Sequence, residues 1–305
     1  MRIFIYNSLI LVFLSSFVLA KEWTKFRGPS GDGHVTVKSI PSKWSDTENI
    51  KWKVPVPGKG WSSPVISADK IYLTSAVAEG DNQDAADVHR ELRVICYNAN
   101  NGNKLWDTKV FDQKPLKRPI HHKNSHASPT AIVENERVYV HFGHMGSACL
   151  NLQGEIIWKN DKLKYDPLHG NGGTPIIVDD LFFYSADALT NPFVVALDKN
   201  TGKVVWKKSR SETKQARKFS FSTPTFINMG GRSQIISPAS GAVFSYDSKT
   251  GEELWSVDYG GWSVIPKPGV YKNMIYVGTG YERAHLLGIR VDEKSKGNVT
   301  ESHVE

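Results

Sequence analysis

Polar and aromatic residues gather at several points of the chain, most of them just before a short apolar run, and nearby loops add further charged side chains. If these points share one face of the fold, the side chains converge on a concave site. A few polar groups among aromatic walls are what a small-molecule or glycan pocket requires. The alternative is that they satisfy backbone groups and water in a wet central channel, and both interpretations stay open. The candidate residues are Trp61, Lys123, Asn124, His126, His169, Asn171, Asp187, Trp262, Tyr281 and Arg283.

Histidines suggest a second chemistry, because six of the ten lie between His121 and His169. The spacings of His122 with His126, and of His141 with His144, would suit a transition metal. On a strand, however, His141 and His144 point to opposite faces unless a turn at Gly143 intervenes. We therefore expect structural or hydrogen-bonding histidines and predict no metal site.

The two cysteines, Cys96 and Cys149, would be disulfide candidates in an exported protein. Alignment of internal repeats places them instead at the position that Ala196 and Ser245 occupy in later repeats. Equivalent positions in separate repeats lie too far apart to bridge. We predict two buried structural thiols.

An internal repeat supplies the elements that must position all these residues. A glycine is followed four residues later by a tryptophan four times, with Trp spacings of 52, 48 and 49 residues. A small residue and a proline precede each repeat, at Ser63-Pro64, Ser128-Pro129, Thr174-Pro175 and Thr223-Pro224. The repeated pairs are Gly102 and Trp106, Gly154 and Trp158, Gly202 and Trp206, and Gly251 and Trp255.

Between these anchors lie β-branched and aromatic runs of four to six residues, which predict strands. The turn before each tryptophan contains an Asx residue that can bond the backbone ahead of it, and a glycine that can adopt positive φ. About fifty residues with four short strands is the size of one propeller blade. The sequence therefore predicts an all-β propeller of four-stranded blades.

The segment from Ala196 to Trp206 resembles the tryptophan-docking repeat of the pyrroloquinoline-quinone (PQQ)-like propeller superfamily. This superfamily includes quinoprotein alcohol dehydrogenases and BamB-type outer-membrane assembly scaffolds. The stretches 23–33, 60–64 and 123–129 resemble exported bacterial PQQ-binding-like repeat proteins. The resemblance covers residues 23–305, and it implies a fold more strongly than an activity because the docking motif is architectural.

A quinoprotein relationship would imply PQQ and Ca²⁺, with carboxylate and amide ligands, an Asp base and a Trp that stacks on the quinone. Asp187, with Asn171 or Asn124, could be recruited as ligands, and Trp262 as the stacking floor. No local run matches the family's catalytic signature, and the chain lacks the adjacent cysteine pair typical of these enzymes. Both departures weaken the expectation of a PQQ cofactor.

About five blades are expected, whereas propellers of this superfamily usually have seven or eight. The fifth blade begins near Trp262 and reaches Gly297 without the expected tryptophan. The segment from Asn49 to Val54 resembles the last strand of a blade. We expect a ring truncated at the C-terminus, with a completing second chain as the alternative.

The N-terminus predicts export. An apolar run from Ile3 to Leu19 ends in a small-residue cleavage pattern at Ala20, and no later segment could span a membrane. We expect a signal peptide at 1–20, an N-terminal extension at 21–48 and the propeller at 49–305, in the periplasm or outside the cell. An uncleaved membrane anchor is the alternative to the signal peptide.

Composition narrows the functional classes. With 40% hydrophobic and 23% charged residues, the chain is neither disordered nor collagen-like. Its net charge of +7 is spread without a Lys/Arg block, so nucleic acid is not the expected partner. We predict a non-catalytic binding or scaffold module for a protein, peptide or carbohydrate. The alternative is a PQQ- and calcium-dependent alcohol or sugar dehydrogenase.

Overall fold

Five sheets, antiparallel except for one short parallel pairing, account for almost all of the regular structure among the described residues. The computed structural model describes residues 22–37, 39–116, 118–281 and 284–305, so the expected signal peptide lies outside the described residues. Three sheets have the four strands expected of a blade, a fourth has these four and one additional strand, and the last has three described strands. The predicted all-β propeller with about five blades is confirmed. We number the sheets blade 1 to blade 5 along the chain.

The strands of each blade follow one another in sequence and in space. Blade 1 contains β1 (Val65–Ser67), β2 (Lys70–Ala78), β3 (Arg90–Asn98) and β4 (Lys104–Gln113). Blade 2 contains β5 (Ile132–Glu134), β6 (Arg137–His141), β7 (Ser147–Asn151) and β8 (Ile156–Asn160), with a 3-10 turn, η1 (Gly143–Met145), after β6. Blade 3 contains β9 (Ile176–Val178), β10 (Leu181–Ala186), β11 (Phe193–Asp198) and β12 (Val204–Ser209).

The last two blades are joined by the C-terminal segment. Blade 4 contains β13 (Thr225–Met229), β14 (Arg232–Pro238), β15 (Ala242–Asp247) and β16 (Glu253–Asp258), and β20 (Gly297–Asn298) adds to β16 in parallel. Blade 5 contains β17 (Gly269–Tyr271), β18 (Met274–Gly278) and β19 (Leu286–Arg290). A short helix, α1 (Thr300–His303), follows β20, and Val304 then bridges to Ile289 of β19.

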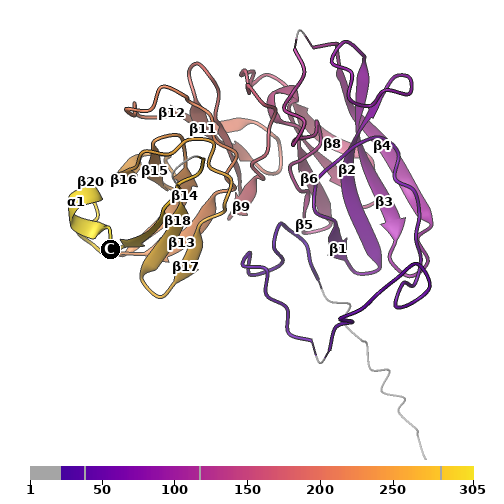
Figure 1. Ribbon diagram of the computed structural model, residues 1–305, viewed down its shortest axis with the longest axis horizontal. Helices are drawn as coiled ribbons and strands as arrows, with labels where there is room; N and C mark the ends of the chain where they lie inside the picture. Colours follow the sequence, from indigo (N-terminus) through magenta and orange to yellow (C-terminus); the bar gives the residue numbers. More distant parts are fainter. Residues whose placement is uncertain (1–21, 38, 117, 282–283) are drawn as a thin grey trace, which may run out of the picture.

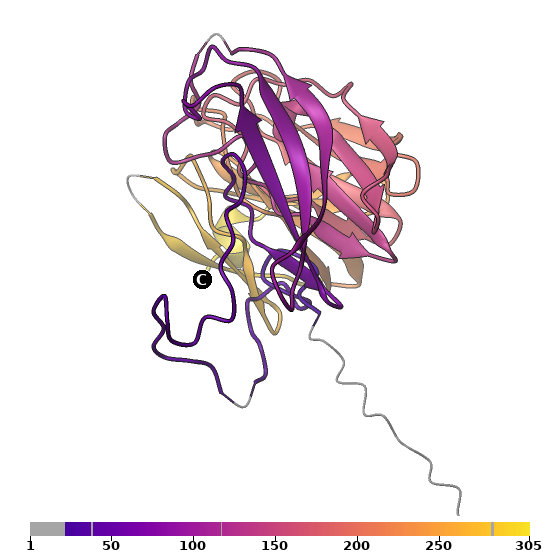
Figure 2. The ribbon, with the colours of Figure 1, turned by 90° about the vertical axis from the view of Figure 1, so that its right-hand side faces the viewer.

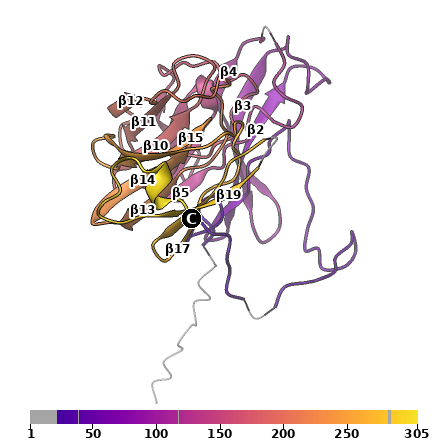
Figure 3. The same ribbon diagram turned by 60° about the vertical axis from the view of Figure 1, so that its left-hand side comes forward.

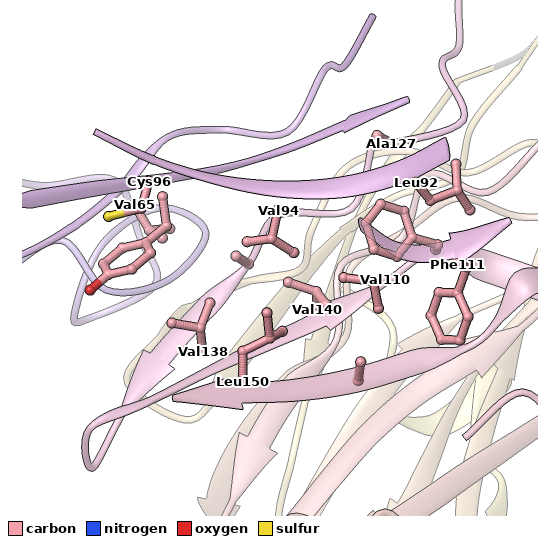
Figure 4. Close-up of a cluster of buried hydrophobic side chains, with 14 of the residues drawn as sticks. Val65, Leu92, Val94, Cys96, Val110, Phe111, Ala127, Val138, Val140 and Leu150 are labelled. Atoms are coloured by element: carbon pink, nitrogen blue, oxygen red, sulfur yellow. The ribbon is translucent and has the colours of Figure 1, made fainter. Parts of the chain in front are cut away.

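Four hydrophobic clusters hold the blades in an arc. Each cluster draws its residues from two consecutive blades: 1 with 2, 2 with 3, 3 with 4, and 4 with 5. Figure 1 shows the strands of blades 1 and 2 on one side of the molecule and those of blades 3, 4 and 5 on the other. Figure 4 shows the first cluster, in which Val94 and Val140 lie between facing sheets. Burial of these apolar faces is the main force that joins the blades.

Strand register explains the small-residue position of the repeat. Cys96 stands opposite Trp106 and Cys149 opposite Trp158, as Ala196 stands opposite Trp206 and Ser245 opposite Trp255. A bulky side chain at this position would crowd the indole across the strand pair. Both cysteines are free and buried, which confirms their predicted structural role.

Each repeated glycine lies against the tryptophan of the blade before it. Gly154, Gly202 and Gly251 have φ of 87°, 70° and 70°, and a Cβ on any of them would come within 2.7 Å of Trp106, Trp158 or Trp206 respectively. Nε1 of Trp106 and of Trp158 also donates to a carbonyl of the following blade, at Leu152 and Lys199. The glycine is therefore required both by the left-handed turn and by the close approach of the indole.

The segment before blade 1 repeats this contact without belonging to a sheet. A Cβ on Gly102 would lie 2.7 Å from the Trp52 ring, and Trp52 Nε1 donates to the Ala99 carbonyl at 3.0 Å. Before Trp52, much of the stretch 39–50 loops away from the sheets (Figures 2 and 3). No helix among the described residues has the length and apolar character needed to cross a membrane.

Candidate functional site

A cavity of about 810 Å³ opens where the segments leading into the blades converge. Its walls come from blades 1 to 5 and from the loop at residues 26 and 27. The cavity is axial, because every blade contributes the segment that precedes its first strand. The lining residues are Phe26, Arg27, Trp61, Ser63, His121, Lys123, Asn124, Ser128, Thr130, His169, Gly172, Thr174, Arg217, Phe219, Phe221, Thr223, Trp262, Ser263, Ile265, Pro266, Lys267 and Tyr281.

A chain of hydroxyl contacts fixes these segments relative to one another. The Thr130 hydroxyl accepts the backbone N–H of Ser63 at 3.0 Å, and the Thr174 hydroxyl accepts that of Thr130 at 3.1 Å. The Thr223 hydroxyl in turn accepts the N–H of Thr174 at 3.0 Å. Each bond satisfies a buried or half-buried amide of one blade with a side chain of the next, so the wall is a connected polar network.

In blade 2, the residue that occupies this position before the first strand is not the one that the sequence alignment of the repeats indicated. Ser63, Thr174 and Thr223 each lie two residues before the first strand of their blade, and in blade 2 that position is Thr130. The sequence pairing of Ser128-Pro129 with the other Ser/Thr-Pro pairs is therefore wrong by two residues. Ser128 instead bonds within its own loop, to Asn124 Oδ1 at 2.6 Å.

Six of the ten predicted site residues line the axial cavity: Trp61, Lys123, Asn124, His169, Trp262 and Tyr281. His126 lines a neighbouring hollow of about 520 Å³, together with Lys59, Asp84 and Arg90. Burial lowers the pKa of His126 to about 4, and the nearby Arg90 acts in the same direction. Arg283 lies outside the described residues.

Asp187 and Asn171 do not line the cavity, contrary to the sequence expectation. Asp187 is buried and forms a two-point ion pair with Arg210, in which Nε donates to Oδ1 at 2.6 Å and Nη2 to Oδ2 at 3.0 Å. Burial raises the pKa of Asp187, and Arg210 opposes this effect. Asn171 Oδ1 accepts the Tyr165 hydroxyl at 2.8 Å. Sequence periodicity could not reveal these partners, because they are set by packing between loops and strands.

Three cavity cations were missed by the sequence analysis: Arg27, Arg217 and Lys267. The Arg217 guanidinium lies over the Trp262 ring, 4.4 Å from its centroid, and Lys267 Nζ donates to the Gly31 carbonyl at 3.0 Å. Burial, and then the charges of Arg27 and Lys25, lower the pKa of Lys267 to about 8. Lys267 stands directly before Pro268 in the segment leading to blade 5, so its position in the repeat could have identified it as a cavity residue from the sequence. Arg27 precedes the repeats, so the sequence pattern could not identify it.

The histidines do not form a metal centre among the residues that the structure describes, where no group of three or more His, Cys, Asp or Glu could hold an ion. His141 is buried, and its Nδ1 lies 2.9 Å from the Ser147 hydroxyl. His121 packs on His122 and on His169, with ring centroids 4.4 Å and 5.3 Å apart. The His144 ring packs against the Tyr165 ring.

The donor set of the cavity does not fit calcium. Ca²⁺ takes six to eight oxygen ligands and relies on carboxylates, whereas no Asp or Glu among the described residues lines the cavity. The carboxylate that a quinoprotein site would recruit, Asp187, is occupied by Arg210. A calcium-bound quinone therefore does not fit the described residues.

The repeat along the chain matches a known protein family. A model of PQQ-like repeats, described as outer membrane protein assembly factor BamB, matches residues 18–186, 90–258 and 191–297. The chain belongs to this PQQ-like repeat family. The overlapping matches span the whole arc, as expected when one unit repeats along the chain.

Two curated relatives of this PQQ-like repeat chain are dehydrogenases. It is 32% identical over 140 residues to a quinoprotein ethanol dehydrogenase of Pseudomonas aeruginosa, a match to 41% of this chain and 22% of that protein. It is 33% identical over 96 residues to a 1-butanol dehydrogenase (quinone) of Thauera butanivorans, a match to 28% of this chain and 14% of that protein. The chain thus aligns with less than a quarter of each relative.

A solved structure gives the same fold. A quinohemoprotein alcohol dehydrogenase from Pseudomonas putida HK5 superposes with a TM-score of 0.51 and 12% identity, over 88% of this PQQ-like repeat chain and 45% of that chain. At this identity the likeness shows the fold alone.

Proposed function

We propose that the protein is an exported, non-catalytic binding or scaffold module whose ligand site is the axial cavity. The observation that carries the proposal is the composition of the cavity wall: cations, aromatic rings, hydroxyls and two histidines, with no carboxylate among the described residues to act as base or calcium ligand. Such a wall can orient and hold a ligand, but its described residues include no carboxylate to serve as the Asp base that the resemblance to quinoproteins would imply. Aromatic and polar side chains at a concave face suit a protein, peptide or carbohydrate partner.

Export and a place in the cell envelope are part of this proposal. They are supported by the apolar run before Ala20 in the sequence and by the family description, which names an outer membrane assembly factor. Fractionation of cells that express the full chain tests them. Processing near Ala20 and recovery in a periplasmic or secreted fraction are expected, and an unprocessed cytoplasmic protein would contradict export.

A quinoprotein dehydrogenase is the second candidate, because the ethanol dehydrogenase relative is 32% identical over 140 residues. Titration of the purified chain with PQQ and CaCl₂, followed by absorbance, separates the two. We expect no calcium-dependent complex and no dye-linked oxidation of ethanol, 1-butanol or glucose. A stoichiometric complex that requires calcium and supports turnover would overturn the non-catalytic proposal.

A further inference from the structure

Four cations that form no ion pair with a described carboxylate converge on the axial cavity. Arg27 comes from the N-terminal loop, and Lys123, Arg217 and Lys267 come from the segments that lead into blades 2, 4 and 5. None of the four forms an ion pair with a described carboxylate. Their mutual repulsion is strengthened where water is partly excluded, so the cavity favours a ligand with negative charge.

Lys267 contributes to this preference from the segment that leads into blade 5. Its Nζ donates to the Gly31 carbonyl, and an ammonium has three N–H donors, so donors remain for a ligand. The position is half-buried between the N-terminal loop and blade 5. Burial and the positive charges of Arg27 and Lys25 make the charged form costly there, and a carboxylate beside Nζ would remove that cost.

Arg217 and the aromatic rings define the shape of the ligand. The Arg217 guanidinium carbon lies 4.4 Å from the Trp262 ring centroid, and the planar fork of a guanidinium can hold a carboxylate at two points. Trp61 and Tyr281 are 48% and 64% exposed, and Tyr281 meets Trp262 edge-on at 6.0 Å. Flat, exposed rings beside cations suit a ligand that has apolar ring faces as well as carboxylates.

An acidic peptide satisfies these features less well. Peptides in extended form gain affinity by adding a strand to an unpaired sheet edge, and the first strands of blades 1, 2 and 3 have only three residues each. The threonine hydroxyls in the wall are engaged between blades. A pyranose carries its own hydroxyls and packs its C–H face on an aromatic ring, so it needs no strand edge.

We propose that the axial cavity binds an acidic oligosaccharide, with its carboxylates on Arg217 and Lys267 and its sugar rings on Trp61 and Tyr281. The inference rests on the proposed binding function and names its ligand class. It predicts that tight binding requires both the negative charge and the pyranose rings of the ligand.

Calorimetric titration of the purified chain with tetragalacturonate, cellotetraose and tetraglutamate tests this. Tetragalacturonate is expected to bind at least about tenfold more tightly than either of the others, and to weaken with added salt. R217Q and K267Q should each weaken it about tenfold, since each removes one charge-assisted contact. K208Q removes the same charge from the exposed outer strand β12 and should leave binding within about twofold, because a distant exposed charge is screened.

Three outcomes would overturn the proposal. Equal binding of tetraglutamate, sensitive to R217Q, would make the site a peptide site and keep the binding function. Equal binding of cellotetraose would remove the role of charge, again with the binding function intact. No binding of any of the three probes by a folded chain would reject the ligand class, while the PQQ titration separately decides between binding and catalysis. Circular dichroism of each variant establishes that it is folded. W61A keeps all four cations and removes one aromatic ring, so it tests the ring contact separately from the charges.

Discussion

At the scale of single residues, the charge state of Lys267 should control ligand affinity. Its pKa is lowered to about 8 by burial, then by Arg27 and Lys25, while Asp32 raises it. The protonated form holds an anion, so affinity for tetragalacturonate should fall as pH rises from 7 to 9. His169, which also lines the cavity, has a lowered pKa and is therefore neutral throughout this window.

Calorimetry across this pH range measures the effect, and K267R is the matched variant. An arginine remains charged at all of these pH values, so the decline with pH should disappear while binding is retained. If the wild type and K267R lose affinity in parallel, another group controls the pH dependence and Lys267 does not contact the ligand.

His141 makes a second, independent prediction about stability. Burial, together with the nearby His144, lowers its pKa to about 3, whereas an unfolded chain has a His pKa near 6.5. Below about pH 6.5 the unfolded state therefore binds a proton that the folded state excludes, and stability falls as pH falls. This one group accounts for up to about 1.4 kcal/mol per pH unit.

Urea unfolding between pH 4.5 and 7 measures the slope. H141Q keeps a polar side chain near the Ser147 hydroxyl but cannot titrate, so its stability should depend less on pH than that of the wild type. H34Q, at an exposed position, is the control and should keep the wild-type slope. An unchanged slope in H141Q would show that other groups, such as His126, dominate.

The same scale shows where sequence reasoning about the site failed. Residues directly before the first strand of a blade, such as Trp61 and Trp262, were placed at the cavity because their position follows from the repeat. Asp187 was expected there too, but it does not line the cavity, because it is buried in an ion pair with Arg210 from another loop. Charge pairing between distant segments leaves no periodic signal, and Arg27 reaches the cavity from a segment without any repeat.

At the scale of the elements, the turn chemistry made the fold predictable. Asp198 Oδ1 accepts the N–H groups of Asn200 and Thr201, at 3.0 and 2.8 Å, and Gly202 follows with positive φ. These local bonds recur at Asp247, so the sequence alone marks the turn between the last two strands of blade 3 and of blade 4. The short parallel strand β20 has no such signature and was not predicted.

The contact between Gly202 and the preceding blade gives the element-scale prediction. An alanine Cβ at this position would lie 2.4 Å from Trp158, so G202A must displace the indole as well as strain the backbone. Gly231 has almost the same φ, 71° against 70°, but nothing within 4 Å of its Cβ position. We expect G202A to lose about 1–3 kcal/mol more than G231A, which is the usual cost of overpacking.

Chemical denaturation of the two variants measures this difference, since the backbone strain of a left-handed position is common to both. If G202A and G231A are equally destabilised, the approach of Trp158 contributes nothing and the glycine serves only the turn. The tryptophan fluorescence of folded G202A gives a second readout, because a displaced indole changes its environment.

At the scale of the whole molecule, stability should vary along the arc. Blades 2, 3 and 4 each pack on two neighbours, whereas blades 1 and 5 each take part in only one of the four clusters. The two ends nevertheless differ. Trp52 and Val54 cover Gly102 of blade 1, while blade 5 has three described strands and leaves Leu286 73% exposed.

Amide hydrogen exchange should reveal this gradient, because local opening depends on how many buried contacts an element makes. The amides of β10, in the central blade, should exchange most slowly, those of β2 at an intermediate rate and those of β18 fastest. W52A should bring the exchange of β2 and β3 toward that of β18 and leave β18 itself unchanged, because only blade 1 loses its cover. Uniform protection of all five blades, unaffected by W52A, would mean that the arc opens as one cooperative unit and that the contact at Gly102 does not stabilise its end.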